Sequence, residues 1–221
     1  MRVVIAGGHG KIALILERLL SQRGETVAGF IRNPAHSADL VDAGSEPIVM
    51  DLEEATADEV AAHLRGADAV VFAAGAGPGS GAARKESVDR DAAILLADAA
   101  QQAGIRRYVM ISAMGADAEA PEDIGDPVFV AYLRAKGAAD KDIRERQALA
   151  STIVRPGLLS DEPGTGRVKI APKTGRASIA RADVAAVLLA VLDAPGTAGQ
   201  TFEVISGDTP IVEAVTTSTC R

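Results

Sequence analysis

The chain has 221 residues, enough for one large domain or two small ones, and its 48% hydrophobic and 24% charged residues are typical of a globular protein. A net charge of −7 without a basic cluster, with only 3% aromatic residues and no tryptophan, argues against a nucleic-acid partner. The single cysteine, Cys220, excludes an internal disulfide, and His9, His36 and His63 lack metal-ligand spacing, so we expect no metal site.

The first predicted element is a strand over residues 2–6, which is continuously apolar and β-branched, like a strand buried on both faces. This run is too short for a signal peptide or a membrane span, so we expect a cytoplasmic protein with no membrane partner. Glycines follow at once, and residues 11–23 then form a predicted helix with apolar side chains along one side.

Strands and helices alternate along the rest of the chain. We predict strands over 26–31, 46–50, 69–74, 108–112, 151–155 and 201–205, with helices over 87–103 and 130–147. Because the strands are apolar throughout, this order predicts an α/β fold, a Rossmann-type doubly wound parallel sheet with helices on both faces. We expect a single domain over 1–221, with a short C-terminal extension on the substrate side.

Irregular segments follow several of these strands. Residues 75–83 and 113–127 come after carboxyl ends of strands, where open α/β sheets bind ligands. The segment 157–175 is rich in Gly, Pro and charge, and we interpret the three segments together as a cleft lid rather than a separate domain. We assign 156–180 and 206–221 to substrate-side loops and the extension. The charged loop residues are interpreted as solvated: Arg84, Lys85, Asp161 and Glu162.

The first strand leads into a turn with the spacing G-x-x-G-x-x-A, formed by Gly7, Gly10 and Ala13. The first glycine permits a tight turn, the second admits a diphosphate close to the backbone, and the small third residue lets helix and sheet pack closely. The helix start then offers free N–H groups and partial positive charge to phosphates. The turn therefore predicts dinucleotide binding, with a plain strand–helix turn as the alternative.

The end of the second strand favours NADP over NAD. An acid there would bind the 2′-hydroxyl of the adenosine ribose, whereas an arginine would bind a 2′-phosphate. Residues 29–34 contain Arg32 and no acid. A guanidinium can present two parallel N–H groups to a phosphate, so we predict that Arg32 selects NADP; a solvated loop arginine is the alternative.

Several of these segments together resemble a known family. Gly7-Gly8-His9-Gly10, Arg32-Asn33-Pro34, Asp51-Leu52 and Ala73-Ala74-Gly75 are similar to the short-chain dehydrogenase/reductase superfamily. They resemble most its atypical branch of small NAD(P)H-binding proteins, some of them described as sugar epimerases. The segments 132–136, 152–157 and 181–185 are similar too. The resemblance covers nearly the whole chain and implies fold and cofactor, while the branch includes reductases, epimerases and non-catalytic redox sensors.

The resemblance also implies which residues hold the cofactor. Asp51 and Leu52 would flank the adenine, residues 73–76 would pass the ribose, and Pro156 and Gly157 would approach the nicotinamide. A helix cap, packing residues and a turn are the alternatives for these positions. The predicted cofactor-binding set is Gly7, Gly8, His9, Gly10, Lys11, Ile12, Arg32, Asp51, Leu52, Ala73, Ala74, Gly75, Ser112, Lys136 and Pro156.

Tyr132 and Lys136 are the candidate catalytic pair, with Ser112 as a third member. At a separation of four residues they share a helix face, so the ammonium can lie near the phenol and lower its pKa toward neutrality. Ser112, at the end of the fifth strand, would orient the substrate oxygen. Asp89 occupies the helix position that often carries Asn in the superfamily. The alternative is a half-buried helix aromatic beside a surface cation.

The sequence leaves the reaction open. We expect first an NADP(H)-dependent oxidoreductase that transfers hydride to or from a small carbonyl or alcohol. An NAD(P)-dependent sugar epimerase uses the same residues and comes second, and a non-catalytic NADP(H) sensor comes third. Reduction of a flavin or quinone would need no tyrosine. The expected partner is a small-molecule substrate that the sequence does not identify. The chain is expected to be a monomer or homodimer.

Overall fold

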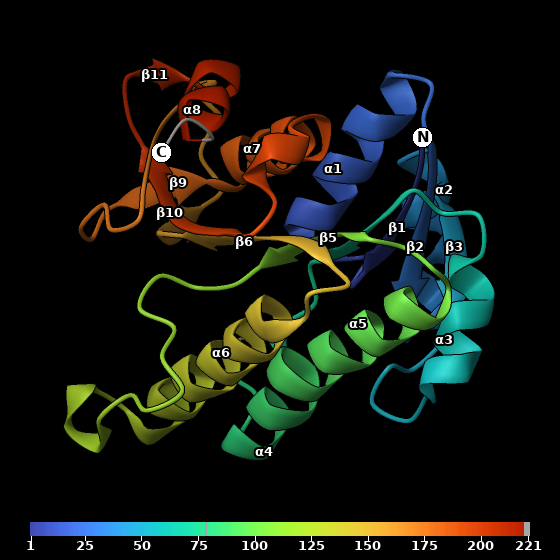
Figure 1. The fold of residues 1–221 in the computed structure, drawn as a ribbon, viewed down its shortest axis with the longest axis horizontal. Helices are drawn as coiled ribbons and strands as arrows, with labels where there is room; N and C mark the ends of the chain where they lie inside the picture. The colour runs from blue at the N-terminus through green and yellow to red at the C-terminus, as the bar shows by residue number, and fades with distance from the viewer. Residues whose placement is uncertain (78, 219–221) are drawn as a thin grey trace.

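The protein is described here by a computed structural model that covers residues 1–77 and 79–218. Cys220 and the last residues of the predicted extension lie outside the described residues. The central feature is a nine-stranded sheet in the order β11-β8-β10-β6-β5-β4-β1-β2-β3, shown edge-on between two layers of helices in Figure 1. All neighbours from β3 to β10 pair in parallel, which confirms the predicted Rossmann-type α/β fold.

The strands follow the predicted order. Their bounds are β1 (Arg2–Ala6), β2 (Thr26–Ile31), β3 (Glu46–Val49), β4 (Ala69–Phe72), β5 (Arg107–Ile111), β6 (Ala150–Pro156), β7 (Leu158–Ser160), β8 (Arg167–Ala171), β9 (Ser178–Ala180), β10 (Gln200–Ser206) and β11 (Thr209–Pro210). The strands β7 and β9 form a separate parallel pair.

The helices include several that the apolar pattern of the sequence did not predict, notably α2, α3 and α7. Their bounds are α1 (Lys11–Gln22), α2 (Ser37–Asp42), α3 (Ala57–Leu64), α4 (Ala82–Arg84), α5 (Ala92–Gln102), α6 (Pro127–Glu145), α7 (Arg181–Asp193) and α8 (Ile211–Ser218). A π-helical segment, Lys85–Asp91, joins α4 to α5. Among the described residues, none of the helices is both long and apolar enough to cross a bilayer.

Two hydrophobic cores lie on opposite faces of the sheet. In β1, Val3 and Ile5 pack into the core beneath α1, α7 and α8, while Val4 and Ala6 pack into the core formed with α3, α5 and α6 (Figure 1). Successive strand residues point to opposite faces, and both faces are covered here. This is the physical reason for the unbroken apolar runs in the sequence.

The segment 157–175 differs from the irregular lid that we expected. It contains β8, which pairs antiparallel with β10 and extends the main sheet, and β11 pairs antiparallel with β8. Val168 is fully buried in the core under α7, whereas its neighbours Arg167 and Lys169 are exposed. Ile170, two residues on, is partly buried against the same core, so the strand contributes only two apolar residues to it, which is too short a pattern to stand out in the sequence.

The strand order reverses direction between β1 and β4, which is where open α/β sheets bind ligands. Ala6 lies opposite Phe72 in this pairing, and the amide of Ala73 donates to the carbonyl of Ala6 over 2.9 Å. The turn that starts at Gly7 and the loop that starts at Ala73 therefore leave the sheet side by side. These two loops position the site described next.

Candidate functional site

The glycine-rich turn lies directly against the loop after β4. Gly7 has φ of +81°, a conformation that favours glycine, and a Cβ atom there would lie 2.6 Å from the Cα of Ala74. Gly10 is the extended residue before α1, and no side chain caps this helix start. The first N–H groups of α1 are thus left for an anion, as a diphosphate requires.

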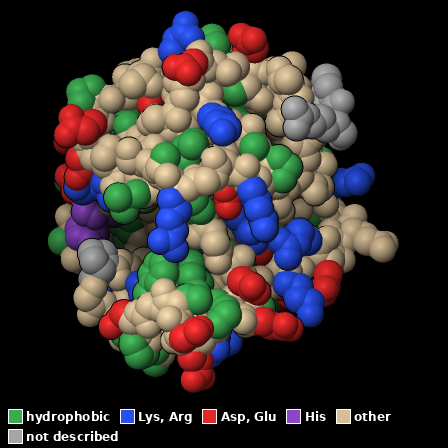
Figure 2. Space-filling view, turned by 90° about the vertical axis from the view of Figure 1, so that its left-hand side faces the viewer, with side chains coloured by type: hydrophobic (Ala, Val, Ile, Leu, Met, Phe, Trp, Pro, Cys, Tyr) green, Lys and Arg blue, Asp and Glu red, His purple; other side chains and the backbone are tan. Residues whose placement is uncertain are grey.

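A cavity of about 340 Å³ opens beside this turn. On the face seen in Figure 2, a hollow lies next to histidine side chains and above a hydrophobic cluster. The cavity is lined by the end of β2, by residues that follow β1, β2, β3 and β4, and by one residue each from α4, the π-helical segment and α5: Gly7, His9, Gly10, Phe30, Ile31, Arg32, Asn33, His36, Met50, Asp51, Leu52, Glu53, Ala73, Ala74, Gly75, Arg84, Val88 and Ala92.

Nine of the predicted cofactor-binding residues line this cavity, from the first turn to the loop after β4. Three others from the turn do not. The amide of Gly8 donates to the carbonyl of Phe30, the Lys11 Nζ lies 2.5 Å from an Asp161 oxygen, and Ile12 is buried in the core. Asp161 also pairs with Arg181 over 2.6 Å, and its side chain stays exposed, as expected for a solvated loop residue.

The two histidines of the cavity form a stacked pair. The rings of His9 and His36 lie 3.6 Å apart, almost parallel, and His9 Nε2 lies 2.7 Å from an Asp39 oxygen. His36 was not among the predicted site residues. Its short helical turn, 34–36, begins after Asn33, whose side chain accepts from the amide of Ala35. This local cap positions His36 at the cavity.

Arg32 does not stand alone at the end of β2. Its Nη1 lies 3.0 Å from an oxygen of Glu53, and the same oxygen lies 2.7 Å from Arg84 Nη2. The Ser87 hydroxyl donates to the other Glu53 oxygen over 2.6 Å. These contacts, chiefly the bond from Arg84, hold the pKa of Glu53 below its usual range. Neither Glu53 nor Arg84 was predicted as a site residue, because they come from separate loops that only the fold brings to Arg32.

Lys136 is buried at the carboxyl ends of β4 and β5. Its Nζ donates to the carbonyl of Ile111 over 3.1 Å and lies 3.5 Å from that of Ala74 and 3.3 Å from Asp89 Oδ1. The other Asp89 oxygen accepts from the amide of Ala76 over 3.2 Å. The ion pair therefore ties α6 to the π-helical segment and to the loop after β4.

Tyr132 lies one turn before Lys136 on α6, as predicted, but its pKa is shifted in the opposite direction from our expectation. Burial raises the pKa of Tyr132 above its ordinary value, and the carboxylates of Asp89 and Asp140 raise it further. The charge of Lys136 is already compensated by Asp89, which explains why it does not favour a phenolate. The phenol is therefore held in its neutral form.

Lys85 is a second lysine at this tyrosine that the sequence did not single out. Its Nζ lies 5.2 Å from the centre of the Tyr132 ring and donates to the carbonyl of Gly77 over 2.9 Å. We expected a solvated loop cation, whereas Lys85 is 9% exposed. The π-helical segment turns Lys85 inward, and such segments are frequent at functional sites.

Ser112 follows β5 and is buried beside Asp140 of α6. The Ser112 hydroxyl is close enough to Asp140 to stabilise its ionised form. Within the described residues, however, the hydroxyl oxygen of Ser112 makes no hydrogen bond of normal geometry. Asp140 is paired with Arg155 over 2.7 Å. Four further predicted site residues are absent from the linings of the two cavities described here: Ser112, Tyr132, Lys136 and Pro156.

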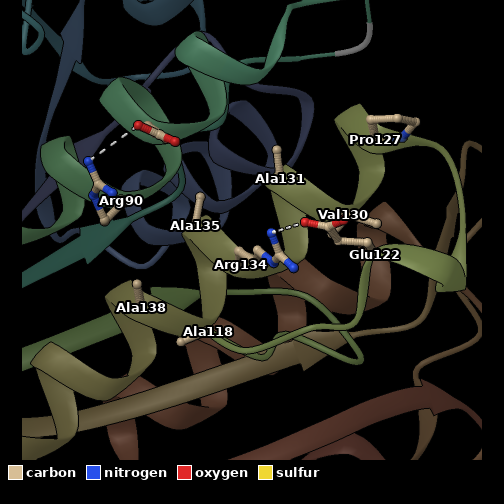
Figure 3. A pocket seen from close by; sticks show the side chains of 10 residues that line it. Arg90, Ala118, Glu122, Pro127, Val130, Ala131, Arg134, Ala135 and Ala138 are labelled. Atoms are coloured by element: carbon tan, nitrogen blue, oxygen red, sulfur yellow. Dashed lines mark ion pairs between the residues drawn. The ribbon is translucent and has the colours of Figure 1, made fainter.

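A larger hollow of about 600 Å³ lies on the outer side of α6, away from the glycine-rich turn. Figure 3 shows small alanine side chains between two ion pairs, Arg90 with Glu86 and Arg134 with Glu122. The ion-pair distances are 3.8 and 3.9 Å. This hollow shares no lining residue with the cavity at the turn.

The residues at the turn fit a dinucleotide. The close approach of Gly7 to Ala74 leaves no room for a side chain, the start of α1 lacks a side-chain cap, and the arginines Arg32 and Arg84 line the adjoining cavity. Together they offer backbone amides for a diphosphate and guanidinium groups for a further anion.

Comparisons with known proteins agree with this geometry. A model of an NAD(P)H-binding family matches residues 7–195. A sugar epimerase of Bacillus subtilis (strain 168), itself uncharacterized, is 38% identical over 216 residues, which are 97% of this chain and 99% of the relative.

Two solved structures extend the comparison. A candidate NAD-dependent epimerase/dehydratase from Bacillus halodurans superposes with a TM-score of 0.88 at 38% identity, over 97% of this chain and 98% of the other. The oxidoreductase ylbE from Lactococcus lactis superposes with a TM-score of 0.83 at 26% identity, over 98% and 96%. The resemblance drawn from the sequence to small NAD(P)H-binding proteins is thereby confirmed. The chain belongs to the NAD(P)H-binding family.

Proposed function

We propose that this protein is an NADP(H)-dependent oxidoreductase that reduces a small carbonyl substrate to an alcohol. The observation that carries the proposal is one cavity in which two guanidinium groups, from Arg32 and Arg84, line the same space as the glycine-rich turn. A turn with free amides binds the diphosphate, and an arginine at the end of β2 selects the 2′-phosphate.

The chemistry of the substrate side depends on Tyr132. NADPH, when bound, supplies the hydride that reduces the carbonyl carbon. Tyr132 donates its phenolic proton to the carbonyl oxygen and regains a proton from solvent. Its raised pKa keeps the proton in place until negative charge develops on that oxygen. Lys136 would hold the loop after β4 and the end of β5 in place beside a bound cofactor, because its Nζ donates to the carbonyl of Ile111 and lies 3.5 Å from that of Ala74.

The name of the Bacillus subtilis relative favours a second candidate, a sugar epimerase. An epimerase begins by removing a proton from an alcohol, so its tyrosine must first act as a base. Burial, with Asp89 and Asp140 next, raises the pKa of Tyr132 and keeps its phenol protonated at neutral pH, so the resting protein holds a proton donor and not the phenolate base with which an epimerase cycle begins. This supports the reductase over the epimerase. Nucleotide that stays bound through purification and does not exchange would favour the epimerase instead.

Calorimetric titration with NADPH and NADH tests the cofactor assignment. Arg32→Ala is expected to weaken NADPH binding by about 1–3 kcal/mol, as for a charge-assisted hydrogen bond, while NADH binding stays unchanged. Equal affinity of the wild type for both nucleotides would contradict the role of Arg32. Absence of binding to either would overturn the proposed function altogether.

A further inference from the structure

The ion cluster around Glu53 is built from three separate parts of the chain. Arg32 follows β2, Glu53 follows β3, and Arg84 ends the short helix α4. One Glu53 oxygen lies 3.0 Å from Arg32 Nη1 and 2.7 Å from Arg84 Nη2, and the other accepts from the Ser87 hydroxyl over 2.6 Å. Arg32, Glu53 and Arg84 all line the cavity at the glycine-rich turn.

The donors around this carboxylate are those that a phosphate monoester takes. Two guanidinium groups and a hydroxyl converge on one small anion, and a phosphate offers three strong acceptor oxygens and up to two negative charges to the same set. Without an anion between them, the two arginines would repel each other. The Glu53 carboxylate therefore keeps them together, but it also competes for the donors.

We infer that Arg84 is a second arginine for the 2′-phosphate of NADPH, and that Glu53 is the internal anion that this phosphate displaces. The inference rests on the proposed NADP(H) dependence and extends it. Glu53 then sets the selectivity between the two cofactors. With NADPH it must release both arginines, whereas with NADH it can accept a hydrogen bond from the ribose 2′-hydroxyl.

The position of Arg84 connects this ion cluster to the residues around Tyr132. Arg84 immediately precedes Lys85, which donates to Gly77 in the loop after β4 and lies over the Tyr132 ring. Asp89 of the same π-helical segment pairs with Lys136. The π-helical segment that contacts Tyr132 and Lys136 thus begins directly after Arg84.

Two variants with matched controls test the inference. Glu53→Gln removes the competing charge, and Glu54→Gln removes an equal charge from the exposed neighbouring residue. Arg84→Ala removes the second arginine, and Arg90→Ala removes an arginine from the π-helical segment that lines the other hollow. Each is titrated with NADPH and NADH, and with 2′-AMP and 5′-AMP as probes of the adenosine site alone.

We expect Glu53→Gln to bind NADPH and 2′-AMP three- to tenfold more tightly, with no gain for NADH or 5′-AMP. Arg84→Ala is expected to bind NADPH and 2′-AMP about tenfold more weakly, with NADH unchanged. The dissociation constants of the two control variants should stay within twofold of those of the wild type. Circular dichroism and thermal unfolding check that every variant is folded.

Two results would overturn the inference. Weaker binding of NADPH and NADH alike in Glu53→Gln would mean that the carboxylate only holds the loops together. An unchanged NADPH-to-NADH ratio in Arg84→Ala would remove Arg84 from the phosphate site. If Arg32→Ala still lowers that ratio, the proposed function stands and only this inference fails. If the wild type binds no pyridine nucleotide, both fail.

Discussion

Lys136 and Asp89 form an ion pair that is almost completely removed from water. Their charged atoms lie 3.3 Å apart, and the two side chains are 4% and 1% exposed. Taking two charges out of water is costly, so each depends on the other and on its remaining hydrogen bonds. The pair also leaves Tyr132 without an uncompensated cation from Lys136. The stability of the site therefore depends on this pair, and Asp89 adds to the effect of burial in keeping Tyr132 neutral.

Breaking this pair from either side is expected to destabilise the fold. Asp89→Asn and Lys136→Met each leave one buried charge unpaired and should lower the free energy of unfolding by about 3–5 kcal/mol. Urea denaturation measures the change. The double variant removes both charges, so its loss should be clearly smaller than the sum of the two. Additive losses, or a loss below about 1 kcal/mol for either single variant, would show that the two charges do not depend on each other.

Tyr132→Phe is expected to separate the chemistry from cofactor binding. The variant should bind NADPH within twofold of the wild type but reduce aldehydes and ketones about 10²- to 10⁴-fold more slowly, because the proton donor is gone. Tyr108, the other tyrosine of the chain, is buried with its hydroxyl on the carbonyl of Ala93, so Tyr108→Phe is the matched control. Tyr108→Phe should lower the free energy of unfolding and leave kcat unchanged.

The reaction catalysed by the wild type should keep its rate on the alkaline side. A general acid works while it is protonated, and the pKa of Tyr132 is raised by burial and then by Asp89 and Asp140. We therefore expect kcat for carbonyl reduction to stay level up to about pH 10, the ordinary pKa of tyrosine. A fall in kcat beginning near pH 7 would contradict the neutral phenol. Full turnover by Tyr132→Phe would point to a quinone or flavin acceptor. No turnover by either the wild type or the variant would point to a sensor.

Glu17 provides a pH dependence of stability. Its carboxyl group is fully buried behind the glycine-rich turn, where a Cβ on Gly8 would lie 3.0 Å from Glu17 Oε1, and burial raises its pKa to about 8. Between pH 4.5 and 8 the folded protein keeps a proton that the unfolded chain releases. Its contribution to stability is therefore full below pH 4.5 and is lost as the pH rises toward 8.

Glu17→Gln should remove this dependence. Relative to the wild type, the variant is expected to gain roughly 3–4 kcal/mol between pH 5 and pH 8, because each pKa unit corresponds to 1.36 kcal/mol. Chemical denaturation at the two pH values measures the gain. Glu54→Gln, at an exposed position, should change the free energy of unfolding by the same amount at both pH values. An equal effect of Glu17→Gln at pH 5 and pH 8 would mean that the buried carboxyl is ionised in the folded protein.

Gly137 allows the loop after β5 to lie against α6, beside Tyr132 and Lys136. A Cβ there would lie 2.2 Å from backbone atoms of Asp117 and Ala118. Gly→Ala inside a helix ordinarily stabilises, but here we expect Gly137→Ala to destabilise by about 1–3 kcal/mol through overpacking. Thermal unfolding measures it. Gly81→Ala, where a Cβ meets no atom within 4 Å, is the control and should be nearly neutral.

The sequence by itself determined the parallel sheet and its cofactor turn. Continuous apolar strands such as 2–6 and 26–31 report burial on both faces, and their bounds agree with β1 and β2. The positive φ of Gly7 is a local backbone requirement that glycine meets, and so the sequence can indicate it, whereas the close approach of Gly7 to Ala74 is set by the fold. Arg32, too, was placed at the cavity by its position after the second strand.

Only the tertiary structure decided which charges meet. Glu53 and Arg84 are separated by 31 residues and join Arg32 because β2, β3 and β4 end at one edge of the sheet. Asp89 reaches Lys136 because the π-helical segment packs on α6, and burial of Tyr132, with Asp89 and Asp140 nearby, raised rather than lowered its pKa. The energy of a charge depends on burial and on its neighbours in space, and neither is written in the local pattern of the chain.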